Sequence, residues 1–135
     1  MVRWCGHVPE ADLPALYAAA DVYLGLSRPI GPHVEGFGLS LLEAQAAGRP
    51  VVAGLGGGTG DAVAHGVTGF LVPPDQCAPA LAAVAELLRD RSRAQVVGAA
   101  GRARMEREFG WDRVVRDLNQ AAAAFRSAPA ARVGR

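Results

Sequence analysis

The sequence predicts an α/β fold in which a parallel sheet of about four strands carries helices on its faces. In the first half of the chain, short apolar runs alternate with segments of helical periodicity. These runs lack a regular polar–apolar alternation, as is typical of strands covered on both faces. The repeated strand–helix–strand order favours parallel pairing with right-handed crossovers.

The four predicted strands cover residues 2–5, 22–26, 51–53 and 70–72. Before the second of them, apolar residues recur at helical spacing from Leu13 to Ala20, and Asp12 is the predicted N-cap. A second helix is predicted over residues 39–47, because Gly48 and Pro50 are typical of a helix end. A short helical turn over residues 61–65 is expected to end at Gly66.

After two consecutive prolines at 73 and 74, the pattern becomes helical throughout. The first of three predicted helices carries one apolar stripe: Leu81, Val84, Ala85 and Leu88. The second, residues 92–109, is charged on one side, and the third, residues 112–125, has one apolar face. We expect Trp111, where these two helices join, to anchor the core. Residues 1–126 are predicted to form one domain and residues 127–135 a flexible tail.

Composition is that of an ordinary globular protein: of 135 residues, 50% are hydrophobic and 20% are charged. The formal net charge of +1 gives no large field for nucleic acid or an acidic membrane, so no nucleic-acid partner is expected. No apolar run approaches the roughly 20 residues of a membrane span. Cys5 and Cys77 lack metal-ligand spacing, and we expect two buried thiols in a cytoplasmic protein without a metal site.

The pattern most informative about function places Glu35 and Glu43 on either side of a Gly-Phe-Gly turn that begins a helix. A helix start exposes unpaired N–H groups and a partial positive charge, which suit a phosphate. Gly36 and Gly38 let the backbone approach a ligand closely. Carboxylates on each side would accept hydrogen bonds from sugar hydroxyls. The pattern therefore predicts a nucleotide-sugar site.

Two loops are expected to meet at this site, because ligands of open α/β sheets lie beyond the carboxyl ends of the strands. Residues 27–38 follow the second predicted strand and residues 54–60 follow the third. The glycine-rich second loop either cradles a phosphate or forms a plain turn, and the sequence leaves both interpretations open.

Residues 35–52 resemble the Glu-x7-Glu signature of retaining GT-B glycosyltransferases, and best the large bacterial group that uses UDP- or GDP-sugars. Within that group they are similar to phosphatidylinositol mannoside mannosyltransferases and their relatives. Segments 6–8, 16–22, 57–61, 66–72 and 109–111 resemble the same family in the same order. The resemblance concerns only the later part of the second, donor-binding domain. It implies a partial Rossmann-like sheet, the C-terminal half of a GT-B fold without its first strands.

The resemblance implies transfer of a sugar from a UDP- or GDP-sugar to an acceptor hydroxyl, with retention at the anomeric carbon and without a metal or other cofactor. Glu35 is the implied catalytic residue and holds hydroxyls of the donor sugar, whereas Glu43 binds the ribose diol. Backbone amides of residues 37–39 meet the sugar and the diphosphate. The implied donor-binding residues are Val8, Gly36, Phe37, Gly38, Leu39 and Glu43.

Parts of such an enzyme have no counterpart in this chain. The acceptor domain is one, and the donor-phosphate Arg and Lys before the Gly-x-Val segment are another; all 14 basic residues are arginines. We therefore expect the donor-binding portion of an enzyme, inactive alone, which needs an N-terminal acceptor domain or a partner chain. Contact with a membrane surface is expected only through that missing half.

Three further residues are candidate site residues, each with a plainer alternative. Arg28 would contact a phosphate or is merely solvated. His33 would act as an acid or base or has no catalytic role. Asp61 would face the sugar or cap its short helix. Glu35 and Glu43 themselves would, outside this motif, be interpreted as solvated surface carboxylates.

The alternative function class is a non-catalytic module that binds nucleotide-sugars or a protein partner. Missing leading strands would leave a sheet edge uncovered, and such edges invite pairing with another chain or with a second copy. Nucleotide binding and the oligomeric state distinguish the two classes.

Overall fold

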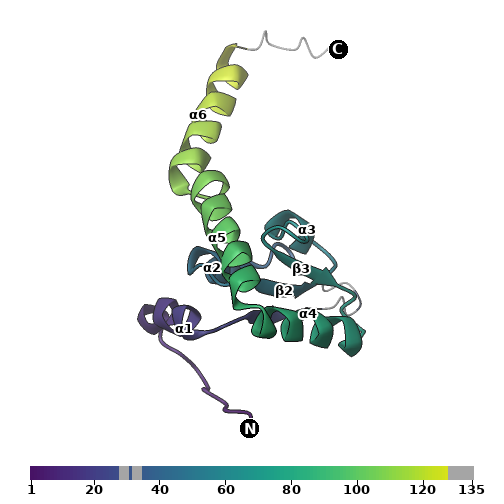
Figure 1. Cartoon of the computed structure of the whole chain (residues 1–135). Helices are drawn as coiled ribbons and strands as arrows, with labels where there is room; N and C mark the ends of the chain where they lie inside the picture. Colours follow the sequence, from purple (N-terminus) through teal and green to yellow (C-terminus); the bar gives the residue numbers. More distant parts are fainter. Residues whose placement is uncertain (28–30, 32–34, 128–135) are drawn as a thin grey trace.

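The computed structural model describes residues 1–27, 31 and 35–127, and it arranges them as helices around a small parallel sheet (Figure 1). The strands β1 (Tyr23–Gly25), β2 (Val51–Gly54) and β3 (Gly69–Val72) pair in that order. The register places Leu24 beside Val52 and Val52 beside Phe70. The predicted α/β class with a parallel sheet is confirmed, with three strands among the described residues.

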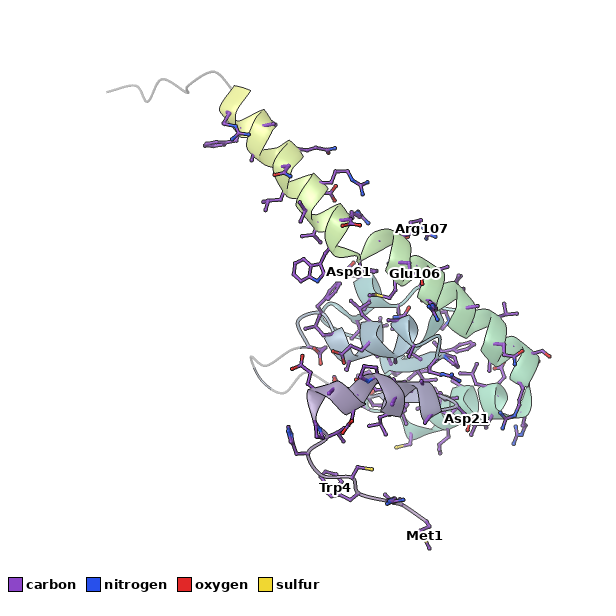
Figure 2. All side chains as sticks on the ribbon, turned by 90° about the vertical axis from the view of Figure 1, so that its left-hand side faces the viewer. Met1, Trp4, Asp21, Asp61, Glu106 and Arg107 are labelled. Carbon is purple, nitrogen blue, oxygen red and sulfur yellow. The ribbon has the colours of Figure 1, made fainter. Side chains whose placement is uncertain are left out.

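The prediction of a fourth strand at residues 2–5 is wrong. This segment is exposed, Trp4 to 91%, and Figure 2 shows Met1 and Trp4 extending away from the rest of the molecule. An apolar run becomes a strand only where a neighbouring strand and a covering layer stabilise it. Within the described residues nothing supplies either, so the sheet ends at β1.

The segment before β1 forms a 3₁₀ turn, η1 (Glu10–Asp12), followed by α1 (Leu13–Ala19). Asp12 occupies the predicted N-cap position of α1, but its side chain makes no capping hydrogen bond. Its backbone is already helical, φ −95° and ψ −15°, whereas an N-cap residue needs an extended conformation to reach the following amides. Pro14 lies in the first turn, where a missing N–H costs nothing.

The helix α2 (Leu39–Ala46) ends as the sequence predicts. Gly48 has a φ of +71°. Its N–H donates to the Gln45 carbonyl at 2.8 Å, and the Arg49 N–H donates to the Ala44 carbonyl at 2.9 Å. These two bonds form a Schellman motif, which satisfies carbonyls at the helix end. By contrast, α3 (Thr59–Ala62) begins two residues before the predicted turn at 61–65 and ends earlier, because Val63 is already extended.

The sheet separates two apolar clusters, and all of β2 is buried between them. On one face, Val51 and Ala53 pack with residues of α2, and Met105 of α5 (Arg91–Glu108) reaches the same cluster. On the other face, Val52 packs with residues of α4 (Cys77–Arg89). Because β2 is covered on both faces, its sequence is continuously apolar.

The apolar stripe predicted on α4 is displaced by one residue. Ala80, Ala83 and Leu87 are buried, whereas Leu81 is 68% and Leu88 50% exposed. Two of these three buried residues are alanines, whose small side chains let the helix lie close to the sheet. Cys77, at the start of this helix, is exposed, as is Cys5, so the expectation of buried thiols is also wrong.

The helix α5 (Arg91–Glu108) packs closely against α2. The Asp90 carboxylate accepts a hydrogen bond from the Arg93 N–H at 2.9 Å and caps the helix start. Gly98 and Gly101 are buried, and a β-carbon on Gly98 would overlap the Gly48 carbonyl oxygen. The absence of side chains at these two positions therefore allows the close approach.

The helix α6 (Trp111–Ser127) continues from α5 and projects away from the sheet (Figure 1). Side chains 111–126 are exposed, and Trp111 is 79% exposed, so it is not the predicted core anchor. Of the predicted tail at 127–135, only Ser127, the last residue of α6, belongs to the described residues. Among the described helices, none combines the length and apolarity needed to cross a bilayer.

The contact between α5 and α2 generates a stability prediction. Replacing Gly98 with alanine should lower the free energy of unfolding by about 2 kcal/mol, because the new methyl group meets backbone rather than a side chain that can move. Chemical denaturation measures this loss. Val96→Ala, at an exposed position of the same helix, is the control and should change stability by less than about 0.5 kcal/mol. Equal stability of both variants would contradict the close packing.

Candidate functional site

The loops that follow β1 and β2 meet at one edge of the sheet, as the sequence predicts. The Gly58 N–H donates to the Glu35 carbonyl at 3.0 Å. A β-carbon on Gly57 would overlap that carbonyl oxygen, and one on Gly58 would overlap the carbonyl oxygen of Gly36. Gly57 also has a φ of +55°, which disfavours other residues. Glycine at both positions is therefore required for the two backbones to touch.

Thr59 fixes the shape of the glycine-rich loop. Its buried hydroxyl lies 2.9 Å from the Gly54 carbonyl and 2.8 Å from the Gly56 carbonyl, and it accepts the Gly56 N–H at 3.1 Å. Since the amides of Gly56 and Gly58 are bonded within the protein, this geometry favours a structural turn over a phosphate cradle. Sequence reasoning missed Thr59, although a threonine among glycines at a helix start is a recognisable signal.

The start of α2 lies directly against this loop. Gly38 precedes the helix with a φ of +79°, and its N–H donates to Glu35 Oε1 at 3.1 Å. The backbone N–H groups of Phe37, Leu39 and Ser40 have no partner within the described residues. Such open amides, together with the helix dipole, attract an anion. Two of the three amides predicted for a ligand, at Phe37 and Leu39, are thus available, and that of Gly38 is bonded.

The Glu35 carboxylate is half-buried and organises the loop. Oε1 accepts the Gly38 N–H, and Oε2 accepts the Ser27 hydroxyl at 3.1 Å. A carboxylate has about four acceptor positions, so two of them remain available to a ligand.

Glu43 lies one turn further along α2 and is exposed. The hydroxyl of Tyr17, on α1, donates to Glu43 Oε2 at 2.8 Å. Burial, and then the bond to this carboxylate, raise the pKa of Tyr17 well above its usual range, so the hydroxyl keeps its proton. Sequence reasoning missed Tyr17 as part of the site.

Glu43 borders two hollows. A groove of about 540 Å³ separates α1 from α2, and Leu13, Pro14, Tyr17 and Arg102 contribute to its walls. A second hollow, of about 500 Å³, lies between α2 and the junction of α5 with α6. Volumes of this size are ordinary for small-molecule sites.

The second hollow is apolar where it meets the Gly-Phe-Gly turn. The Phe37 ring lies 5.7 Å from that of Phe109, and both line the hollow with Leu39 and Trp111. The guanidinium of Arg104 lies 5.2 Å above the Phe109 ring. These contacts fasten the turn to the carboxyl end of α5.

Arg104 also fixes α3, because it donates to the Asp61 carbonyl at 2.8 Å and to the Ala62 carbonyl at 3.1 Å. Figure 2 shows Asp61 beside the carboxyl end of α5. The Asp61 side chain does not cap α3, so the capping alternative is wrong. Arg104 further pairs with Glu108, and hydrogen bonds from Arg107 and Arg104 lower the pKa of this carboxyl.

The remaining predicted residues are placed as follows. Val8 is half-buried in the segment before η1, and Gly36 and Leu39 are exposed at the start of α2. Arg28 and His33 lie outside the described residues. Within the part of the chain that the structure describes, no group of three His, Cys, Asp or Glu side chains is placed to hold a metal ion.

Comparison with known proteins decides the family. Residues 1–104 match the family described as glycosyl transferases group 1. The chain belongs to this family. It is 43% identical over 119 residues to a GDP-mannose-dependent alpha-(1-6)-phosphatidylinositol monomannoside mannosyltransferase of Mycobacterium tuberculosis, covering 87% of this chain and 31% of that enzyme. It is 43% identical over 107 residues to a D-inositol 3-phosphate glycosyltransferase of Salinispora tropica, covering 79% of this chain and 21% of the relative.

Solved structures of similar proteins have the same fold. Sucrose-phosphate synthase from Thermosynechococcus elongatus superposes with a TM-score of 0.75 at 34% identity, over 92% of this chain and 30% of that one. Anabaena HepE, solved in complex with UDP-glucose, superposes with a TM-score of 0.73 at 26% identity, over 85% and 30%. These matches confirm the expected C-terminal domain of a GT-B glycosyltransferase. The matched part of the chain spans between about a fifth and a third of the relatives' length, 31% of the mycobacterial enzyme and 21% of the Salinispora enzyme.

The contact between the two loops generates the second prediction. Gly58→Ala should lower the midpoint of thermal unfolding by several degrees, because its methyl group pushes the Glu35–Gly36 backbone away. Gly60→Ala is the matched control, since a β-carbon there meets nothing within 4 Å. Differential scanning fluorimetry compares the two. A midpoint for Gly58→Ala that equals that of Gly60→Ala would show that the loops do not touch.

Proposed function

We propose that this chain is the donor-binding portion of a retaining glycosyltransferase that moves a sugar from a UDP- or GDP-sugar to an acceptor hydroxyl. The observation that carries the proposal is the start of α2, where open amides lie between the Glu35 and Glu43 carboxylates. Membership of the family and the likeness to a protein solved with UDP-glucose support it.

The open amides of Phe37 and Leu39 would stabilise the leaving group. In the reaction, the bond between the anomeric carbon and the diphosphate oxygen breaks, and a bond to the acceptor oxygen forms. The proton of the acceptor hydroxyl passes to an oxygen of the departing diphosphate, and the nucleoside diphosphate leaves still carrying negative charge. Backbone donors fixed at a helix start stabilise that developing charge without reorganising.

The two carboxylates would hold the hydroxyl groups of the donor. Glu35, the proposed catalytic residue, would accept bonds from the donor sugar through the acceptor positions that Ser27 and Gly38 leave unused. Glu43 would accept bonds from the ribose diol. Val8 and Gly36 stay candidates for donor contact through the resemblance. By their positions in the sequence, Arg28 stays a candidate for a phosphate contact, His33 for an acid or base, and Asp61 for a contact with the sugar.

The whole protein is proposed to include an acceptor-binding part, as an N-terminal domain or as a partner chain. The proposal rests on relatives about three times as long as this chain, as the 31% coverage indicates. A cytoplasmic setting is proposed as well, because the exposed thiols of Cys5 and Cys77 suit a reducing compartment.

A non-catalytic module that pairs with another chain or with itself is the alternative function. It is favoured by the exposed apolar side chains of α6, which include Val115, Leu118 and Phe125. Light scattering after size-exclusion chromatography distinguishes the two functions when combined with nucleotide titration. A dimer that ignores nucleotides would support the module.

The third prediction concerns Glu43. The chain should bind UDP or GDP weakly, and Glu43→Gln should weaken that binding about tenfold or more, since one charged acceptor is lost from the ribose diol. Isothermal titration calorimetry measures both. Glu86→Gln, on α4 across the sheet, is the matched control and should leave the affinity unchanged. No heat of binding at millimolar nucleotide would overturn the proposed function.

The fourth prediction concerns metals. We propose that backbone amides, rather than a cation, meet the diphosphate, so EDTA should leave the affinity for UDP or GDP unchanged. The same titration is repeated in EDTA and in excess Mg²⁺. An affinity that falls in EDTA and returns with Mg²⁺ would contradict a metal-independent site.

A further inference from the structure

We infer that Tyr17 is a positioning residue that holds the Glu43 carboxylate ready for the ribose diol of a nucleoside diphosphate. The inference rests on the proposed function of Glu43. Tyr17 lies on α1, 26 positions before Glu43 in the sequence, and its hydroxyl donates to Glu43 Oε2 at 2.8 Å.

Tyr17 is itself held in place, which a positioning residue must be. Its ring lies 5.8 Å from that of Tyr23 on β1 and packs against the buried cluster between the sheet and α2. Tyr17 is half-buried, whereas Glu43 is exposed on the surface of α2. An exposed glutamate samples several rotamers, and a hydrogen bond from a fixed ring selects one of them.

The bond leaves one carboxylate oxygen without a protein partner among the described residues. Oε2 is bonded to Tyr17, and Oε1 makes no bond there. Both residues line the groove between α1 and α2, whose volume of about 540 Å³ suits a small molecule. A diol offers two donors, so a carboxylate of fixed orientation binds it better than one that must first be ordered.

A competing role for the same hydroxyl predicts the opposite effect. If Tyr17 occupied an acceptor position that the ribose needs, then removing the hydroxyl would tighten nucleotide binding. If the Tyr17 hydroxyl only supported the fold, its removal would weaken the binding of every ligand of the site equally. The sign of the change and its dependence on the ribose hydroxyls therefore separate the three roles.

The experiment titrates the full chain and its Tyr17→Phe variant with GDP, UDP and their 2′,3′-dideoxy analogues. We expect Tyr17→Phe to bind the better of the two ribonucleotides about three- to tenfold more weakly, the effect of losing one orienting hydrogen bond. Binding of the dideoxy analogue should not change. In a Glu43→Gln background, the effect of Tyr17→Phe should disappear, because the two residues act as one unit.

Tyr23→Phe is the matched control, since it removes a hydroxyl that makes no hydrogen bond among the described residues and keeps the ring contact. It should leave both affinities unchanged.

The outcomes separate this inference from the proposal on which it rests. If the unaltered chain binds neither nucleotide, the proposed function fails and this inference fails with it. If Glu43→Gln weakens binding while Tyr17→Phe leaves it unchanged or tightens it, the proposed function stands and the role of Tyr17 is overturned. Equal weakening of ribonucleotide and dideoxy analogue also overturns it, in favour of a structural role.

Discussion

The candidate site depends on one contact between two stretches of backbone. The loop after β1 rests on Gly57 and Gly58 of the loop after β2, with no side chain between them. The Thr59 hydroxyl gives the second loop its shape, and the Gly58 N–H then bonds the Glu35 carbonyl. Since Glu35 in turn accepts the Gly38 N–H, this contact sets where α2 begins. The glycine-rich loop after β2 therefore fixes the position of the open amides at the start of α2. It does so without needing to touch the phosphate that those amides would bind.

The opposite face of α2 fixes its orientation. Gln45 is buried and donates to the carbonyl oxygens of Leu41 and Ala62, so that the helix is tied to the end of α3. Gly101 of α5 leaves space for the same glutamine. With its inner face held in this way, α2 presents Glu43 outward to α1. The packing of the buried face of α2 thus fixes the position of Glu43 on its exposed face.

The sequence predicted correctly those features that depend on neighbouring residues in the chain. It failed where contacts between distant segments determine whether a residue is buried or a strand forms. Gly48 ends α2 because glycine alone adopts its backbone angle without strain, and that is visible in the sequence. Among the described residues, the run at 2–5 has strand composition but no pairing strand, and Trp111 has core composition but no neighbour that buries it. On α4, Leu81 and Leu88 belong to the predicted apolar stripe, yet Ala80, Ala83 and Leu87 are the residues buried against the sheet. The motif from Glu35 to Glu43 was predictable for the same local reason, whereas the bond from Tyr17 joins two elements and has no local signature.

Substitutions of Glu35 and of Glu43 would have different effects, because only Glu35 supports the local fold. Glu35 bonds Ser27 and Gly38, so it shapes the loop before any ligand arrives. Replacing it with alanine would remove the acceptor of the Gly38 N–H, and the start of α2 would shift along with any contact to the sugar. Glu43 bonds only the Tyr17 hydroxyl among the described residues, and it lies outside the packed face of α2. A change at Glu43 therefore reports on the ligand, whereas a change at Glu35 mixes the fold with the chemistry. This difference in mechanical role makes the Glu43–Tyr17 pair the more direct probe of what this site binds.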